Sequence, residues 1–210
     1  MAVTSAVAIG YGCGALPFGL WLGRILRGVD VRTRGSGNLG ATNVYRSLGR
    51  GIGVATLVLD VAKGALPVAG LPRGPLGAAF PGGPEWCAIT VGLAAVAGHV
   101  WTVFAGFRGG KGVATAGGVV IALAPAAALI CLAVFVVTVW ISRYISLGSI
   151  LAAAAFPPVL AALSPRGIHQ PTFALGVLMA ALLILRHREN ITRLRRGEER
   201  RFSLRGGASR

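Results

Sequence analysis

Long apolar stretches recur along this chain and leave few ways for it to fold. At about 1.5 Å of rise per residue, four of them have the length or composition of a helix that crosses a bilayer. They are Val3 to Leu22, Ile52 to Leu71, Trp86 to Phe107 and the shorter Phe173 to Leu185. Hydrophobic residues make up 54% of the 210 residues, and the mean hydropathy is +0.71. Soluble domains are less apolar, so we expect the bilayer to be the solvent.

The remaining apolar sequence divides into three further helices. Val113 to Ser142 is too long for one ordinary span, and Pro125 near its middle cannot donate a helix hydrogen bond, so we expect two helices there. Ile145 to Leu163 supplies another. The sequence therefore predicts an all-α, polytopic integral membrane protein with seven transmembrane helices in a single membrane domain, 1–210. The predicted helices cover about residues 3–22, 52–71, 86–107, 113–124, 126–142, 145–163 and 172–186, and a basic cytosolic tail follows at 187–210.

The positive charge is concentrated in the gaps between apolar stretches. With a net charge of +15 and only six acids, the composition alone also fits nucleic-acid binding, but the location of the cations favours cytosolic loops. Placing the first, third and fifth loops and the tail in the cytosol puts 18 of the 21 cations there. We therefore expect the N-terminus outside, the C-terminus in the cytosol, and no nucleic-acid partner.

The N-terminal segment and the cysteines suggest no processing and no metal. Met1 to Leu22 has no basic residue, and Arg24 follows the apolar stretch, so we expect a retained membrane helix and not a cleaved signal. Cys13, Cys87 and Cys131 lack any spacing that would hold a metal, and we interpret them as small buried side chains.

Glycine is abundant, with 32 residues, and in a membrane it lets helix backbones approach closely. The pairs Gly10/Gly14 and Gly19/Gly23 have this small-xxx-small spacing. We expect most of the glycines to serve helix packing.

Ionisable residues inside apolar stretches indicate where function is to be sought, because burying a charge in hydrocarbon is costly. Asp60 and Lys63 lie three apart on one helix face, close enough to pair, and we favour an ion pair that fixes helix packing. His99 lies at a depth similar to that of Asp60, and the two could share one cavity. His99 has two interpretations: a hydrogen-bonded core residue, or a functional group beside the basic glycine loop that follows it.

The first cytosolic loop, Gly35 to Asn43, combines hydroxyls, amides and glycine backbone N–H groups, and Arg46 and Arg50 follow it. Such a loop can hold an anion. Its spacing also fits GxGxxG, but no strand precedes it and Asp60 falls within a membrane helix, so we reject a dinucleotide site.

The second loop, Gly106 to Val113, contains Lys111 among several glycines. It fails as a P-loop because Gly112 stands where Ser or Thr would bind magnesium and because the glycine spacing is wrong. Flexible backbone, a lysine and the N-terminus of the following helix still favour phosphate. We prefer anion binding to the alternative, a plain turn with a snorkelling lysine.

At the end of the last helix, His187 and Asn190 share a face at the membrane boundary, and alone this pair says little. It belongs to a set of five segments: Ser36 to Arg46, Asp60 to Gly64, Gly98 to Thr115, Arg143 to Ser149, and His187 to Ile191. Together these segments resemble the bacterial acyl-phosphate:glycerol-3-phosphate acyltransferase family of the PlsY type. The resemblance covers nearly the whole chain in the family's order.

The resemblance implies a seven-helix enzyme of the bacterial inner membrane with its active site facing the cytosol. Such an enzyme moves an acyl group from acyl phosphate to the C1 hydroxyl of glycerol 3-phosphate, giving lysophosphatidic acid and inorganic phosphate. We expect no cofactor and no metal, membrane lipid as the surroundings, and function as a monomer. The external segment Pro72 to Pro84 and the tail after Glu199 depart from the family pattern without touching a motif.

On this basis we assign roles to individual residues. The expected catalytic groups are Lys111, which stabilises charge on the leaving phosphate, and His99 or His187, either of which could accept the proton, as could the donor phosphate itself. Asp60, Lys63 and Glu199 are expected to be structural. The expected substrate and phosphate-binding residues are Ser36, Asn38, Thr42, Asn43, Arg46, Arg50, Gly109, Gly110, Gly112, Ser146 and Asn190.

Two rival functions fit the same residues. Basic loops and helix N-termini at membrane depth also serve transporters or channels for phosphate-bearing anions. A binding or scaffold protein of the lipid-synthesis machinery is the third hypothesis. Phosphate release that requires both substrates would distinguish the enzyme from either.

Overall fold

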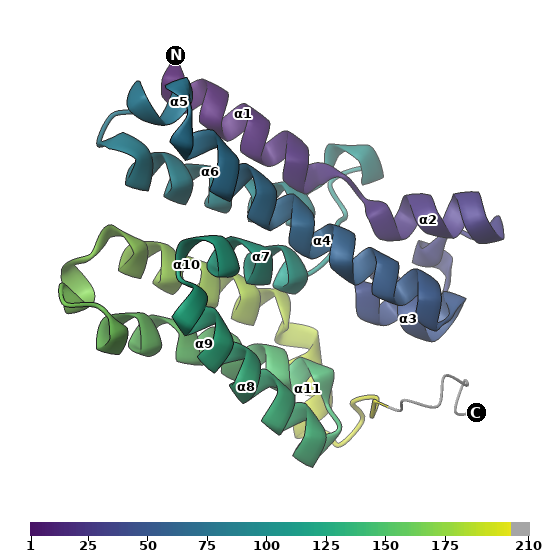
Figure 1. Cartoon of the computed structure of the whole chain (residues 1–210). Coiled ribbons are helices and arrows are strands. Elements are labelled where there is room, and N and C mark those ends of the chain that lie inside the picture. Colours follow the sequence, from purple (N-terminus) through teal and green to yellow (C-terminus); the bar gives the residue numbers. More distant parts are fainter. Residues whose placement is uncertain (203–210) are drawn as a thin grey trace. The chain divides into compact units, whose positions relative to one another are not determined.

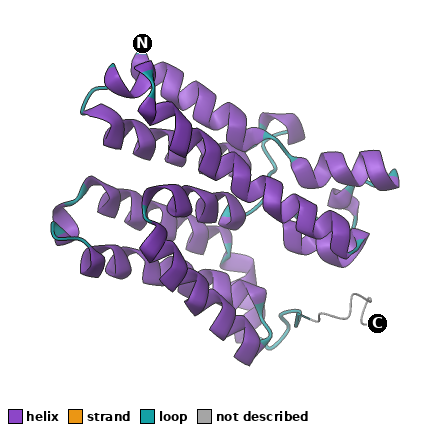
Figure 2. Cartoon of the chain, viewed as in Figure 1, coloured by secondary structure: helices purple, strands orange, loops and turns teal. Residues whose placement is uncertain are grey.

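A computed structural model describes residues 1–202 of the chain, and every regular element in that range is helical (Figures 1 and 2). Contacts divide the chain into two compact units. The first covers residues 1–122, and the second continues from residue 123. The predicted all-α class is confirmed for the described residues.

The first unit contains seven α-helices and three short 3₁₀ turns among its described residues. Its longest helices are α1, α4 and α6; α2 and α3 connect the first two, α5 connects the last two, and α7 follows α6 (Figure 1). The helices are α1 (Ala2–Ala15), α2 (Phe18–Arg27), α3 (Ala41–Leu48), α4 (Arg50–Gly70), α5 (Pro75–Ala78), α6 (Gly83–Val100) and α7 (Val113–Leu123); the turns are η1 (Val31–Thr33), η2 (Leu71–Arg73) and η3 (Val103–Ala105).

Glycines hold the long helices of this unit together. A Cβ atom on Gly14 of α1 would lie 1.9 Å from the carbonyl oxygen of Ala95 in α6, and one on Gly98 of α6 would lie 2.3 Å from the carbonyl oxygen of Tyr11. On the other side, a Cβ on Gly118 of α7 would lie 2.0 Å from the carbonyl oxygen of Val61 in α4. The predicted role of glycine as a packing residue is therefore confirmed at these positions.

The first apolar segment is not the single helix expected over residues 3–22. The helix α1 ends at Ala15, Leu16 is extended, and α2 begins at Phe18. Pro17 explains the break, because proline lacks an N–H and disfavours helical backbone in the residue before it. At about 1.5 Å per residue, the 14 residues of α1 span only about 21 Å.

The third apolar segment also ends earlier than the expected residue 107. The helix α6 stops at Val100, and the chain turns back through η3 with Gly106 and Phe107 at positive φ. The N–H groups of Gly109 and Gly110 then donate to the carbonyls of Val100 and His99, at 3.1 Å each. The returning loop thus satisfies carbonyl groups that the end of α6 leaves without helical partners.

The second unit consists of four α-helices and one 3₁₀ turn within the described residues. The break before Pro125 occurs where the sequence predicted it, and α10 bends by 57° into α11 at His187. The elements are α8 (Pro125–Ser142), α9 (Ile145–Leu163), η4 (Gly167–His169), α10 (Pro171–Arg186) and α11 (Arg188–Arg195).

Five helical segments are long and apolar enough to cross a membrane, and the bent α10–α11 pair makes a sixth if it is one span. These five segments are 2–27, 50–73, 83–105, 125–142 and 145–163. The helix α7 is apolar but has only 11 residues. Only 6% of the helix α8 is buried, and large side chains such as Trp140 and Ile141 are each 74% exposed. Such a surface suits lipid and not water.

The α1–α6 contact generates a matched pair of variants. Gly14→Ala should lower stability by roughly 1–3 kcal/mol, because the added methyl has to displace backbone of α6. Gly12→Ala in the same helix meets nothing within 4 Å, so it should be neutral or slightly stabilising. Thermal unfolding in detergent measures both, and equal melting temperatures for the two variants would contradict this packing.

Candidate active site

Buried polar side chains from α4, α6 and α7 form one network in the first unit. The Nζ of Lys63 lies 2.7 Å from Oδ1 of Asp60, and both side chains are only 3% exposed. The same Asp60 oxygen lies 3.7 Å from Nδ1 of His99, and that nitrogen lies 3.1 Å from the hydroxyl of Thr115. The predicted Asp60–Lys63 ion pair and the predicted proximity of His99 to Asp60 are therefore present.

Lys63 connects this network to the break between α1 and α2. Its ammonium donates to the carbonyl of Leu16 at 2.7 Å and lies 5.6 Å from the ring centroid of Phe18. The hydroxyl of Thr102 donates to the neighbouring carbonyl of Ala15. A cavity of about 10 Å³, enough for about one water molecule, lies among Asp60, Lys63, His99, Thr102 and Gly110.

Asn43 organises the first glycine loop. Its side-chain oxygen accepts from the N–H of Ser36 at 2.9 Å, and its side-chain nitrogen donates to the carbonyls of Asn38, Arg34 and Val31 at 2.9, 3.1 and 3.3 Å. Asn43 is only 5% exposed. In this structure the Asn43 amide thus shapes the loop from its position at the start of α3.

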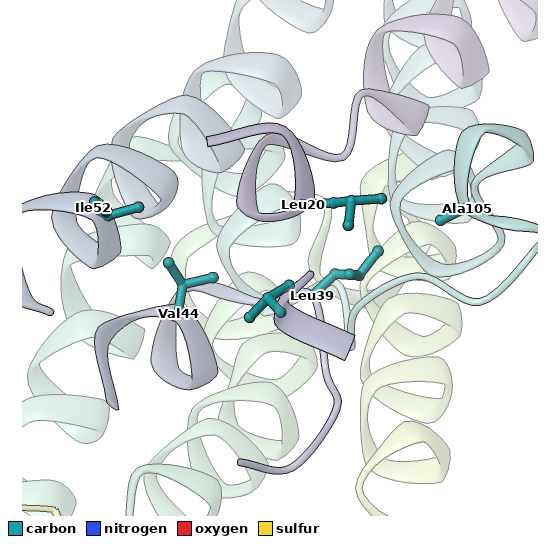
Figure 3. Packing of buried hydrophobic residues seen from close by; sticks show 6 residues of the cluster. Leu20, Leu39, Val44, Ile52 and Ala105 are labelled. Carbon is teal, nitrogen blue, oxygen red and sulfur yellow. The ribbon is translucent and has the colours of Figure 1, made fainter. Parts of the chain in front are cut away.

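A small hydrophobic cluster seats both loops on the helices. Leu39 of the first loop and Ala105 of η3, which leads into the second loop, pack with Leu20 of α2 (Figure 3). Val44 of α3 and Ile52 of α4 complete the labelled part of the cluster. Trp21 of α2 meets Phe104 edge to face, with ring centroids 5.8 Å apart. Loops that are distant in sequence are thereby fixed to the same helix.

The second loop needs glycine for lack of space. A Cβ on Gly109 would lie 1.9 Å from the carbonyl oxygen of His99, and one on Gly110 would lie 2.1 Å from Nε2 of the same residue. The N–H groups of both glycines are used by the end of α6, so these residues contribute room and backbone shape. Gly112, at φ +86°, turns the chain from Lys111 into α7.

A groove of about 470 Å³ lies where the two loops meet. Ser36, Gly37 and Asn38 line it from the first loop, and Arg108 and Gly109 line it from the second. Asp30, Arg32 and Thr33 of the segment around η1 complete the lining. The groove thus combines two guanidinium groups with a hydroxyl and an amide, which suits a phosphate-bearing molecule.

Asp30 fixes Arg32, one of the two arginine side chains that line this groove. Its carboxylate accepts from Arg32 at 2.6 Å and from Arg24 at 2.8 Å. The hydrogen bonds from the Arg32 side chain hold the pKa of Asp30 well below its usual value, against an opposing effect of burial. Asp30 therefore stays ionised and keeps Arg32 charged and oriented.

The other predicted residues of the first unit lie in four places. Ser36, Asn38 and Gly109 line the groove, and Gly110 and His99 line the cavity. Lys111, half-buried, and Gly112 precede α7, whereas Thr42, Arg46 and Arg50 lie on α3 or at the start of α4.

The sequence assigned no role to Asp30, Arg32, Arg108 or Thr115. The one usable signal was the pattern of an acid two residues before an arginine, Asp30-Val31-Arg32, at the entrance to the first loop. Thr115 ends the segment Gly98 to Thr115 that carries the family resemblance, but its proximity to His99 arises only when α6 and α7 pack.

The remaining predicted residues form a cluster of their own in the second unit. One oxygen of Glu199 accepts from Ser146 at 2.9 Å and from Asn190 at 2.6 Å, and the other accepts from Arg193 at 2.8 Å. His187 is 3% exposed, and its Nδ1 lies 2.7 Å from the carbonyl of Leu183, so that nitrogen carries a hydrogen. The union of this cluster with Ser36 and Lys111 in one site stays a prediction.

Glu199 keeps its charge in this cluster. Burial raises the pKa of its carboxyl, but the hydrogen bonds from Arg193, Asn190 and Ser146, with the charge of Arg193, outweigh burial and leave the pKa below its usual value. Three segments, α9, α11 and the chain after α11, therefore meet at one ionised carboxylate. The structural role expected for Glu199 stays a prediction.

The sequence of this chain matches one family of known proteins over nearly its whole length. The family model described as glycerol-3-phosphate acyltransferase matches residues 4–197. The chain belongs to this glycerol-3-phosphate acyltransferase family. Among its members, the glycerol-3-phosphate acyltransferase of Geobacter sulfurreducens is 51% identical over 93% of this chain and 95% of its own. That of Geobacter metallireducens is 55% identical over 91% and 93%.

Solved structures of the acyltransferase family have the same fold. The crystal structure of PlsY (YgiH), an integral membrane glycerol 3-phosphate acyltransferase, in its glycerol 3-phosphate form matches with a TM-score of 0.84. The two sequences are 39% identical, and the match covers 97% of this chain and 96% of the other. The lysophosphatidic acid form of the same protein matches with a TM-score of 0.82. The predicted resemblance to the PlsY family is confirmed.

The hydrogen bonds of Asn43 generate a test of the first loop. Asn43→Ala should cost roughly 1–3 kcal/mol of stability, because it leaves buried backbone groups of the loop without partners. Ser47→Ala is the control, since the Ser47 hydroxyl only reaches Asn43 at 3.5 Å, and it should cost less than about 0.5 kcal/mol. Thermal unfolding and protease sensitivity of the 34–40 segment measure the effect. An intact loop in Asn43→Ala would refute this role.

Proposed function

We propose that this protein transfers an acyl group from acyl phosphate to the C1 hydroxyl of glycerol 3-phosphate, yielding lysophosphatidic acid and inorganic phosphate. The observation that carries the proposal is the groove between the two glycine loops, lined by Ser36, Asn38, Arg32 and Arg108. Family membership adds to it, as does similarity to a structure in its glycerol 3-phosphate form and in its lysophosphatidic acid form.

The chemistry needs no covalent enzyme nucleophile. Acyl phosphate is a mixed anhydride with a good leaving group, so the glycerol hydroxyl attacks the carbonyl carbon directly and the carbon–oxygen bond to phosphate breaks. In the proposed mechanism Ser36, Thr42, Arg46 and Gly112 hold phosphate groups, and Lys111 stabilises the charge that develops on the leaving phosphate. Arg32 and Arg108, which line the groove, add positive charge that attracts the phosphate groups.

The proton of the attacking hydroxyl has three candidate acceptors: His99, His187 and the phosphate of the donor. His99 lies beside the second loop with Nδ1 near Thr115 and Asp60, and its ring is packed against Gly110. In our proposal His187, Asn190 and Ser146 orient glycerol 3-phosphate, and Arg50 adds positive charge at the start of α4. No metal or cofactor takes part in this mechanism.

We further propose that the enzyme is a monomer of the bacterial inner membrane with seven crossings. The five long apolar segments, the α10–α11 pair and the short α7 would supply them. The distribution of basic residues supports an external N-terminus, a cytosolic C-terminus and a cytosolic active site.

The orientation can be tested by labelling single cysteines. In a background lacking the three native cysteines, Ala2→Cys should react with a membrane-impermeant maleimide in intact cells, and Arg188→Cys should react only after permeabilisation. Labelling of Arg188→Cys in intact cells would reverse the proposed orientation.

A phosphate-release assay tests the reaction itself. Purified protein in detergent with palmitoyl phosphate and glycerol 3-phosphate should release inorganic phosphate only when both substrates are present. Lys111→Met should lower the rate by about 100-fold or more, because it removes the cation proposed to face the leaving phosphate. Arg27→Met, a cation of α2 outside the groove lining, is the control and should stay within about twofold of the unsubstituted protein.

Phosphate release measured together with uptake into vesicles separates the enzyme from the rival functions. Uptake of glycerol 3-phosphate into vesicles without turnover would support the transporter, whose basis is the basic loops and the N-terminus of α7. Near-normal turnover by purified Lys111→Met would refute the role of that lysine.

A further inference from the structure

We propose that the buried Asp60–Lys63 pair positions the two phosphate-binding loops relative to each other. The inference rests on the proposed function and deepens it. Neither residue has a part in the proposed chemical step, yet both charges lie in an apolar segment with side chains only 3% exposed. Burying two charges is costly, and a well-packed apolar pair would fill the same space at less cost. What an apolar pair cannot do is make directed hydrogen bonds.

One set of contacts, the first arm, connects Lys63 through the helix α2 to the first loop. Lys63 donates to the carbonyl of Leu16, at the break where α1 gives way to α2. The helix α2 then lies directly on the first loop, because a Cβ on Gly19 would come within 2.3 Å of the carbonyl oxygen of Leu39. Leu20 of α2 and Leu39 also share the hydrophobic cluster of Figure 3. The position of the break therefore sets the position of the loop that carries Ser36.

The second arm runs from Asp60 to the second loop. Oδ1 of Asp60 faces Nδ1 of His99 at 3.7 Å, and Thr115 fixes the same nitrogen at 3.1 Å. The imidazole packs against Gly110, and the carbonyl of His99 accepts from the Gly110 N–H at 3.1 Å. A displaced imidazole would therefore displace the loop that carries Lys111.

The two arms meet in one ion pair on one face of α4. Asp60 and Lys63 lie three residues apart, and their polar atoms are 2.7 Å apart. A movement of one loop relative to the other has to stretch this pair, the Lys63–Leu16 hydrogen bond or the Asp60–His99 contact. Since the groove is lined by both loops, the pair governs the spacing of the groups that meet a phosphate-bearing substrate.

The decisive variant replaces both charges at once. Removing one partner alone would leave a buried unpaired charge, whereas Asp60→Leu/Lys63→Met fills the space without one. We expect this double variant to fold, with a melting temperature lowered only by the loss of the donor to the Leu16 carbonyl. We also expect its kcat/KM for glycerol 3-phosphate to fall by about tenfold or more, with a matching loss of the melting-temperature increase caused by glycerol 3-phosphate. A pair that only packs helices predicts no change in either quantity.

Thr115→Val supplies a second, milder variant. It removes the hydroxyl that fixes His99 and keeps the side-chain volume, so kcat/KM should fall by about fivefold or more at an unchanged melting temperature. Thr138→Val in α8 is the matched control, because the Thr138 hydroxyl bonds only to Val134 within its own helix, and it should leave kcat/KM unchanged. If the double variant does not fold, a fall in kcat/KM with Thr115→Val at an unchanged melting temperature supports the part of the proposal that runs through His99, and an unchanged kcat/KM overturns that part.

The outcomes are separable from failure of the proposed function. An unsubstituted protein that releases no phosphate from palmitoyl phosphate and glycerol 3-phosphate would refute the reaction and leave the substrate-induced melting shift as the readout. Folded variants that fall by less than about fivefold in kcat/KM and keep the full melting shift would overturn the positioning role. Loss of folding in both Asp60→Leu/Lys63→Met and Thr115→Val would also overturn it, because it would assign the network to helix assembly.

Discussion

A helix that ends within an apolar layer leaves carbonyl groups that require donors, and the first unit is built around this requirement. The helix α1 spans only about 21 Å before Pro17 interrupts it. Irregular backbone at such a depth is tolerated only where protein groups or a cavity satisfy it. Lys63 and Thr102 provide the donors, to Leu16 and Ala15 respectively. A cation at the C-terminus of a helix also opposes the negative end of the helix dipole.

The end of α6 also has its free carbonyl groups satisfied by nearby donors. The helix α6 ends at Val100, and the glycine loop that follows returns its N–H groups to the last carbonyls of that helix. Side chains would prevent this return, since a Cβ on Gly109 or Gly110 would collide with His99. The loop is therefore both the cap of α6 and one wall of the groove. A polar site thus arises where two apolar helices stop.

Acidic side chains of the described residues hold basic and polar groups in place, both at the groove and away from it. Asp30 stays ionised because Arg32 and Arg24 donate to it, and it presents Arg32 to the groove in a fixed orientation. Glu199 has a comparable role in the second unit, where Ser146, Asn190 and Arg193 converge on it. Few acids are present in this basic chain. Three of them, Asp30, Asp60 and Glu199, each hold neighbouring donor side chains in place.

The sequence by itself determined the all-α class, the family, the division at Pro125 and the pairing of Asp60 with Lys63, because each depends on composition, on motifs along the chain or on spacing within one helix. It misjudged the ends of the first and third apolar segments, where hydropathy continues beyond the helix. Only the tertiary structure decided that Lys63 serves the α1 break, that Thr115 meets His99, and that Arg32 and Arg108 share a groove. These contacts join helices and loops distant in sequence, and close packing at glycines, not local pattern, brings them together.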